Sequence, residues 1–151
     1  IGRSKAMIIL AAFELGRRRA QSTKRLVHKL ESSKAVFDFM KPALCHLNHE
    51  EFWVLFLNAA QVLSGISQLS KGGVTATIVD VRLLLKKALD YRAVSLILVH
   101  NHPSGQVVPS ASDRSMTERV VKAAGNLDIK VLDHLIVSEK AYFSFADQQL
   151  L

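Results

Sequence analysis

The spacing of apolar residues changes along the chain, and each change predicts a different kind of element. The segments "EFWVLFLN" (51–58) and "VSLILVH" (94–100) are short, nearly unbroken apolar runs, which is typical of strands buried on both faces. Apolar residues at helical spacing, after Ser32 or Ser33 as a cap, predict a helix that ends near His46. The same patterns predict further helices over 4–18, 79–92 and 110–127, and strands over 61–70, 74–78, 129–138 and 141–147.

The order of these elements predicts an α/β domain built in layers, with a mixed sheet and helices on both faces. We expect residues 61–70 to be the hairpin partner of 51–58. Residues 19–31 are basic and polar, and we expect them to form a linker after the first helix. A length of 151 residues is enough for one domain with its own core.

The positive charge of the chain is concentrated near its N-terminal end. The net charge is +7; residues 1–30 hold eight basic residues and one acidic residue, whereas the remaining 121 hold twelve of each. A basic arm of this kind can bind the phosphate backbone of nucleic acids through counterion release. A solvated helix face followed by a linker explains the same charge without a nucleic-acid partner.

Cysteine content and hydropathy limit the class of protein. The single cysteine, Cys45, excludes an internal disulfide framework and any zinc site built from several cysteines. It stands in an apolar, helix-like segment, so we expect a buried, unreactive thiol. No apolar run is long enough to cross a bilayer, and the N-terminal residues do not have the order of a secretory signal. We therefore expect a cytoplasmic protein with no membrane partner, and Ile1 in place of a start methionine suggests a piece of a longer chain.

The segment "HNHPSGQVVPSASD" brings together residue types that bind metals. On an extended backbone, residues two apart point to the same face, so His100 and His102 are expected to face one space at the end of a strand. Ser110 is a good helix cap, which places Asp113 in the first helical turn, where it can point back toward the loop. Two prolines and Gly105 between these residues favour a loop of fixed shape.

Two imidazole nitrogens and one carboxylate oxygen form the kind of three-ligand set that catalytic zinc sites use, with a fourth position left for water. Such a site needs a base, and the acidic pair Glu50 and Glu51 precedes the first buried strand. Each residue also has a structural explanation. A His-x-His pair arises by chance, Asp113 can serve only the helix dipole, and Ser110 can be only a cap.

The spacing His100-x-His102, seven residues, Ser110, two residues, Asp113 resembles the JAMM motif of the JAB/MPN metalloprotease family, and "HNHPSG" resembles its RadC branch. Segments along nearly the whole chain are similar to RadC segments in the same order, including "EFWVLFLN", "DVRLLLKKAL", "KVLDHLIV" and "YFSFAD". The resemblance implies a JAB/MPN layered fold, related in architecture to the cytidine deaminases, over residues 31–151. Residues 1–30 resemble the basic end of a helix-hairpin-helix region followed by a linker.

The resemblance also implies roles for individual residues. It makes His100, His102 and Asp113 the ligands of a zinc ion, Ser110 the residue that stabilises the oxyanion, and Glu50 rather than Glu51 the base. The implied function is a zinc-dependent hydrolase that cleaves a peptide or isopeptide-like amide. The alternative is a DNA-associated repair or recombination protein that uses residues 1–30. His134, in "LDHLIV", is expected to be structural and hydrogen-bonded inside the domain.

Overall fold

The computed structural model describes residues 2–22, 29–72 and 79–151 and places five strands in one sheet, in the order β2-β1-β3-β4-β5. The strands are β1 (Glu51–Leu57), β2 (Leu63–Lys71), β3 (Ser95–Asn101), β4 (Lys130–Val137) and β5 (Tyr142–Ser144). β3 and β4 run parallel, and the other neighbouring strands run antiparallel. The predicted α/β fold with a mixed sheet is confirmed, as is the hairpin of β1 and β2.

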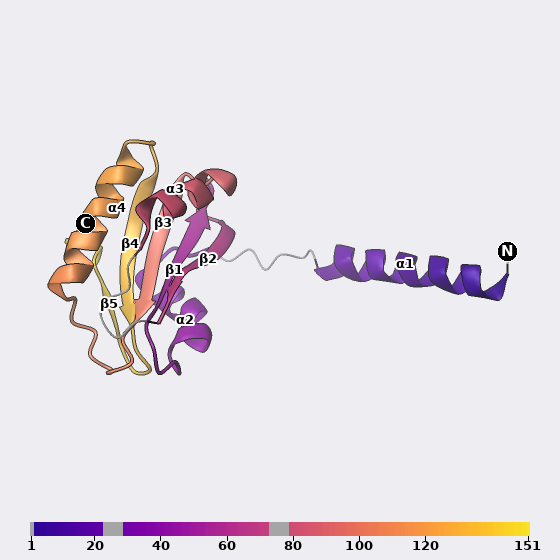
Figure 1. Cartoon of the computed structure of the whole chain (residues 1–151), viewed down its shortest axis with the longest axis horizontal. Coiled ribbons are helices and arrows are strands. Elements are labelled where there is room, and N and C mark those ends of the chain that lie inside the picture. Colours follow the sequence, from indigo (N-terminus) through magenta and orange to yellow (C-terminus); the bar gives the residue numbers. More distant parts are fainter. Residues whose placement is uncertain (1, 23–28, 73–78) are drawn as a thin grey trace.

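Helices pack on both faces of this sheet (Figure 1). The described helices are α1 (Arg3–Ser22), α2 (Ser33–Leu44), α3 (Val81–Asp90) and α4 (Ala111–Gly125). On one face, Val54 and Leu98 belong to an apolar cluster that includes side chains of α3 and α4. On the other face, Leu55 and Val99 belong to a cluster that includes α2. Successive residues of β1 and β3 therefore point into different layers, which explains why both strands are almost continuously apolar.

The register of β1 against β3 sets what surrounds the end of β3. The two strands are antiparallel, and Phe52 lies opposite His100. The chain just before Phe52 therefore lies beside the chain just after His100. β4 runs parallel to β3 on its other side, so the C-terminal ends of both strands meet at the same edge.

The N-terminal helix differs from the prediction. α1 continues to Ser22, so the linker expected from residue 19 is wrong over residues 19–22. Residues 23–28, and the strand expected over 74–78, lie outside the described residues. Figure 1 shows α1 standing apart from the sheet, and its apolar side chains are exposed, with Met7 at 70% and Phe13 at 76%. No helix in the described part of the chain is both long and apolar enough to span a membrane.

The single cysteine lies at the C-terminal end of α2. The Cys45 thiol is only partly buried and donates to the carbonyl oxygen of Ser138 at 3.0 Å. Burial raises the pKa of the thiol, and the charge of Glu139 adds to this rise, whereas Lys41 lowers it. The prediction of a buried thiol is therefore wrong, although a raised pKa keeps the unreactive thiol form dominant.

Candidate metal centre

The two histidines of the motif face one space at the end of β3. The Nε2 atoms of His100 and His102 lie 3.0 Å apart. The extended backbone continues one residue past β3, because the amide of His102 donates to the carbonyl oxygen of Val137 in β4 at 2.9 Å. This continued pairing with β4 gives the two side chains the same-face arrangement that the sequence predicts.

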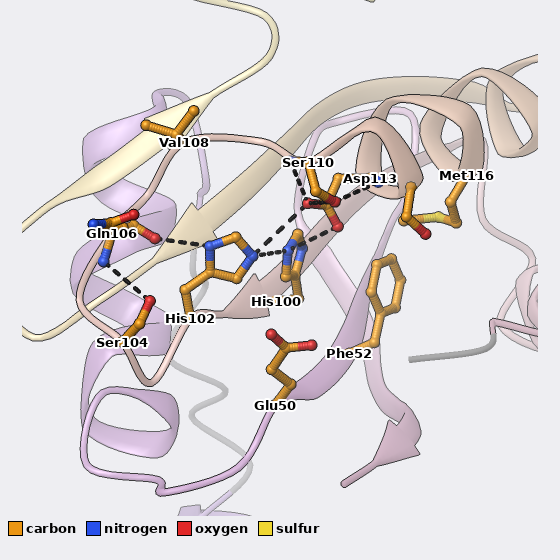
Figure 2. A pocket seen from close by; sticks show the side chains of 11 residues that line it. Glu50, Phe52, His100, His102, Ser104, Gln106, Val108, Ser110, Asp113 and Met116 are labelled. Carbon is orange, nitrogen blue, oxygen red and sulfur yellow. Dashed lines mark hydrogen bonds and ion pairs between the residues drawn. The ribbon is translucent and has the colours of Figure 1, made fainter. Parts of the chain in front are cut away.

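Asp113 reaches the same space from the first turn of α4. Its Oδ1 lies 3.3 Å from His100 Nε2, and its Oδ2 lies 3.8 Å from His102 Nε2. One ligand atom from each of the three residues lies within 4.8 Å of the others. Figure 2 shows the three side chains pointing toward one another across the pocket. Within the described ranges, this is the group of histidine and carboxylate side chains that could hold a metal ion.

Hydrogen bonds hold the carboxylate of Asp113 in place and keep it ionised. The backbone N–H and the hydroxyl of Ser110 donate to Asp113 Oδ2 at 2.8 and 2.6 Å. Burial raises the pKa of Asp113, but the adjacent His100 ring and the two hydrogen bonds from Ser110 outweigh burial. The pKa of Asp113 is therefore well below its usual range, and the group is a carboxylate at neutral pH, as metal binding requires.

Ser110 has a structural role in this arrangement. Its side-chain oxygen accepts from the amide of Asp113 at 3.1 Å, which with the bonds to Asp113 Oδ2 completes a capping box at the start of α4. The single hydroxyl hydrogen of Ser110 is donated to Asp113. To donate to an oxyanion, the hydroxyl would have to turn away from the carboxylate.

Glu50, just before β1, and Glu51, its first residue, point to opposite sides of the sheet. Glu50 lines the pocket together with Phe52, and Figure 2 shows its carboxylate directed toward His100. Glu51 is 5% exposed on the other side, where it accepts from Trp53 Nε1 and pairs with His49 Nε2, both at 2.9 Å. Burial raises the pKa of Glu51, but the hydrogen bonds from His49 and Trp53 outweigh burial and lower it. The structure therefore brings Glu50, and not Glu51, to the three candidate ligands.

The three candidate ligands and Glu50 line a pocket of about 360 Å³. The other lining residues are apolar or uncharged: Phe52, Ser104, Gln106, Val108, Ser110, Ser112 and Met116. No lysine or arginine is among the residues that line this pocket in the described part of the chain. Glu50 and Asp113 are the acidic groups in the lining, so a divalent cation bound there would balance them.

The chemistry of the donor set fits zinc. The Nδ1 of His102 lies 2.7 Å from the carbonyl oxygen of Gln106, which can only accept, so Nδ1 carries the hydrogen and Nε2 presents a lone pair. Gly105 makes this turn possible with a φ of +83°. The two imidazole nitrogens are borderline donors that suit zinc better than magnesium or calcium, and a carboxylate oxygen is a common further ligand of zinc.

Two residues near the site make contacts that the sequence pattern does not predict. His134, predicted to be hydrogen-bonded inside the domain, is completely buried and contacts His100 Nδ1 at 2.8 Å. Asn101, between the two histidines, points to the opposite side of the sheet. Its Oδ1 accepts from the amide of Glu51, and its Nδ2 donates to the carbonyl oxygen of His49. Spacing along the sequence cannot reveal either contact, because the partners come from other strands.

Comparison with known proteins places this geometry in a family. The family model of the RadC-like JAB domain matches residues 30–150, which include every residue of the site. The chain belongs to the RadC-like JAB domain family. Domains of the JAB family typically bind a metal, and the cluster of two histidines and one aspartate in this RadC-like JAB domain could hold one.

Curated relatives of this RadC-like JAB protein are named only as UPF0758 proteins. The one from Flavobacterium johnsoniae is 49% identical over 98% of this chain and 65% of its own length. The one from Porphyromonas gingivalis is 43% identical over the full chain and 67% of its own length. The chain thus spans about two thirds of the length of these relatives.

Proposed function

We propose that this protein is a zinc-dependent hydrolase that cleaves a peptide or isopeptide-like amide bond. The observation that carries the proposal is the convergence of three ligand atoms within 4.8 Å in a pocket that also contains the Glu50 carboxylate. His100, His102 and Asp113 would hold the ion. Zinc held by three protein ligands acts as a Lewis acid and lowers the pKa of water to about 7.

The side chains of the pocket supply the proton transfers that amide hydrolysis needs. Glu50 accepts a proton from the attacking water as the new C–O bond forms. It then donates that proton to the nitrogen of the breaking C–N bond, so the amine leaves in neutral form. The Ser110 hydroxyl, once turned from Asp113, donates a hydrogen bond to the carbonyl oxygen as negative charge develops there.

The charge of the pocket lining favours a neutral amide over a phosphodiester as substrate. A phosphodiester brings negative oxygens, which proteins bind with arginine, lysine or backbone amides. The described lining holds no lysine or arginine, and the carboxylate of Glu50 would repel a phosphate group. An amide carbonyl brings no charge and requires no cationic side chain.

A peptide-library cleavage screen with native protein, combined with metal analysis, tests this function. Glu50→Gln should keep the bound zinc and lower turnover by about 10²–10⁴-fold, because only the proton acceptor is lost. His100→Ala should lose both zinc and turnover. Glu118→Gln, an exposed change on α4, is the matched control and should behave as native. Full turnover in Glu50→Gln, or native protein purified with no bound metal and no gain in activity from added zinc, would contradict the proposal.

A second candidate function, duplex DNA binding, is favoured by the charge of residues 1–30, which equals the net charge of +7 of the whole chain. Replacing the arginines at 17–19 with glutamine should weaken DNA binding and reduce its dependence on salt. A control with the same loss of charge changes Lys87, Lys122 and Lys130 to glutamine. Equal binding by both variants, or binding that does not change with salt, would argue against an arm-mediated DNA contact.

A further inference from the structure

A chain of hydrogen bonds connects the backbone of one candidate ligand to the ring of another. The hydroxyl of Thr117, one turn along α4 from Asp113, donates to the carbonyl oxygen of Asp113 at 2.6 Å. The same hydroxyl oxygen lies 2.6 Å from His134 Nδ1. The other nitrogen of His134, Nε2, lies 2.8 Å from His100 Nδ1. Thr117 is 1% exposed and His134 is 0% exposed, so water does not compete for these bonds.

The donor and the acceptor in each of these hydrogen bonds follow from the first bond, in which Thr117 donates to Asp113. A carbonyl oxygen only accepts, so the one hydroxyl hydrogen of Thr117 is used on Asp113. Toward His134 the hydroxyl can only accept, and His134 Nδ1 must carry the hydrogen. A neutral imidazole has one N–H, which leaves a lone pair on His134 Nε2. His100 Nδ1 must then donate, and the remaining lone pair of His100 lies on Nε2, the atom that faces Asp113 and His102.

We propose that His134 and Thr117 are positioning residues that fix His100 in the tautomer able to bind a metal. The JAMM pattern of His100, His102, Ser110 and Asp113 contains neither residue. The same hydrogen bonds explain why the buried His134, the third histidine near the site, is not a ligand, because its Nε2 lone pair is used by His100. This inference rests on the metal centre of the proposed function, but it does not depend on which bond the enzyme cleaves.

A role in packing alone makes a different prediction. The ring of His134 also stacks on Phe145, with 4.8 Å between centroids and 17° between planes. If packing were its only role, an apolar side chain of similar size would preserve the metal centre once the protein folded. If His134 sets the tautomer, its hydrogen-bonding ability and not its volume decides metal affinity.

The test compares variants that keep or remove each hydrogen bond in the whole 151-residue chain. His134→Gln retains an acceptor for His100 and a donor for Thr117, whereas His134→Leu retains neither. Thr117→Ser keeps the hydroxyl, and Thr117→Val removes it with little change in shape. Ring tautomers are read from long-range ¹H–¹⁵N correlations in metal-free protein, and zinc affinity is read by competition with a chelator. Circular dichroism reports whether each variant is folded.

We expect native His100 and His134 to carry their hydrogen on Nδ1 in the metal-free protein. His134→Leu should shift His100 toward the Nε2–H tautomer and weaken zinc binding by about 10–100-fold, as other changes behind a ligand histidine do. Thr117→Val should weaken zinc binding in the same direction. His134→Gln and Thr117→Ser should bind zinc close to the native value, and that rescue separates tautomer control from packing.

Two results would overturn the proposal. One is a folded His134→Leu variant with native zinc affinity and native His100 tautomer. The other is a native His134 that carries its hydrogen on Nε2. Failure of the proposed hydrolase would look different, since native protein would then bind zinc with His100 in the expected tautomer and still cleave no amide.

Discussion

At the scale of single residues, Asn101 connects Glu50 to the candidate ligands although it faces away from the candidate metal centre. Its two hydrogen bonds reach the residues immediately before and after Glu50, at 2.9 Å to the His49 carbonyl oxygen and 2.8 Å from the Glu51 amide. The backbone that presents Glu50 is therefore attached to the segment that presents both histidines.

Asn101→Ala should destabilise the fold, because it leaves the buried Glu51 amide without its acceptor. The expected loss is about 1–3 kcal/mol in the free energy of unfolding, measured by urea denaturation. Asn101→Asp keeps the acceptor for the Glu51 amide but loses the donor to the His49 carbonyl oxygen, so it should remove only the bond to His49. An Asn101→Ala variant with the native denaturation midpoint would show that the two bonds contribute nothing to stability.

Glu51 predicts a dependence of stability on pH. The pKa of Glu51 is lower in the folded protein than its ordinary value of 4.5, so the unfolded chain binds more protons between the two values. The stabilisation from ionised Glu51 is complete above about pH 4.5 and is lost as pH falls through the lower, folded value. Glu51→Gln should therefore be less stable than native protein at neutral pH, and the difference should shrink in acid.

Trp53 gives this experiment a local reporter, because it is the only tryptophan of the chain and its Nε1 donates to Glu51. Fluorescence-detected denaturation at several pH values would follow both proteins. A stability difference that grows on acidification would mean that the Glu51 carboxylate is not stabilised by the fold.

The choice between Glu50 and Glu51 also shows how far sequence reasoning reaches. The two adjacent acids before the apolar run are both glutamates, and their positions differ by a single residue. Only the register of Phe52 opposite His100 decides which acid shares the face of the ligands. The resemblance to a known motif identified Glu50, whereas the apolar pattern left both open.

At the scale of elements, the first turn of α4 couples helix stability to the candidate ligand set. Ser110→Ala removes the side-chain half of the capping box and one of the two bonds that Ser110 donates to the Asp113 carboxylate. We expect a loss of about 0.5–2 kcal/mol in stability and weaker zinc binding.

Ser115→Ala, an exposed change on the same helix, is the control. Thermal unfolding and chelator competition measure the two effects. Loss of stability with native zinc affinity would mean that the Ser110 hydroxyl does not orient Asp113.

The helices with a capping side chain were predicted close to where they begin. The end of α1 was not, because its basic residues were interpreted as a linker. Ser110 is the observed cap of α4, as predicted, and of the two serines expected to cap α2 it is Ser32 that does so. The segment after residue 18 was interpreted as a linker because it is basic. Arginine, alanine and glutamine are all good helix formers, so α1 extends to Ser22.

At the scale of the whole molecule, metal binding should stabilise the fold. The candidate ligands come from the end of β3, the residues after it and the start of α4, so unfolding separates them. Zinc at one hundred times its dissociation constant should stabilise native protein by about 2.7 kcal/mol.

Chelation should lower the melting temperature of native protein but not that of His100→Ala. His46→Ala, which changes an exposed histidine outside the pocket, should respond to zinc as native. A melting temperature unaffected by zinc would exclude binding at the concentration used.

The register between β1 and β3 has a consequence for how this domain can vary during evolution. Because Glu50 reaches the pocket only while Phe52 stays opposite His100, deleting one residue from β1 would exchange the faces of the two acids. The loop between His102 and Ser110 must also keep its length, because the carbonyl oxygen of its Gln106 holds the His102 ring and its far end presents Ser110. We therefore expect homologous genes to keep the lengths of β1 and of this loop constant, so that diversification in substrate choice would occur by substitution of lining residues such as Ser104 and Val108.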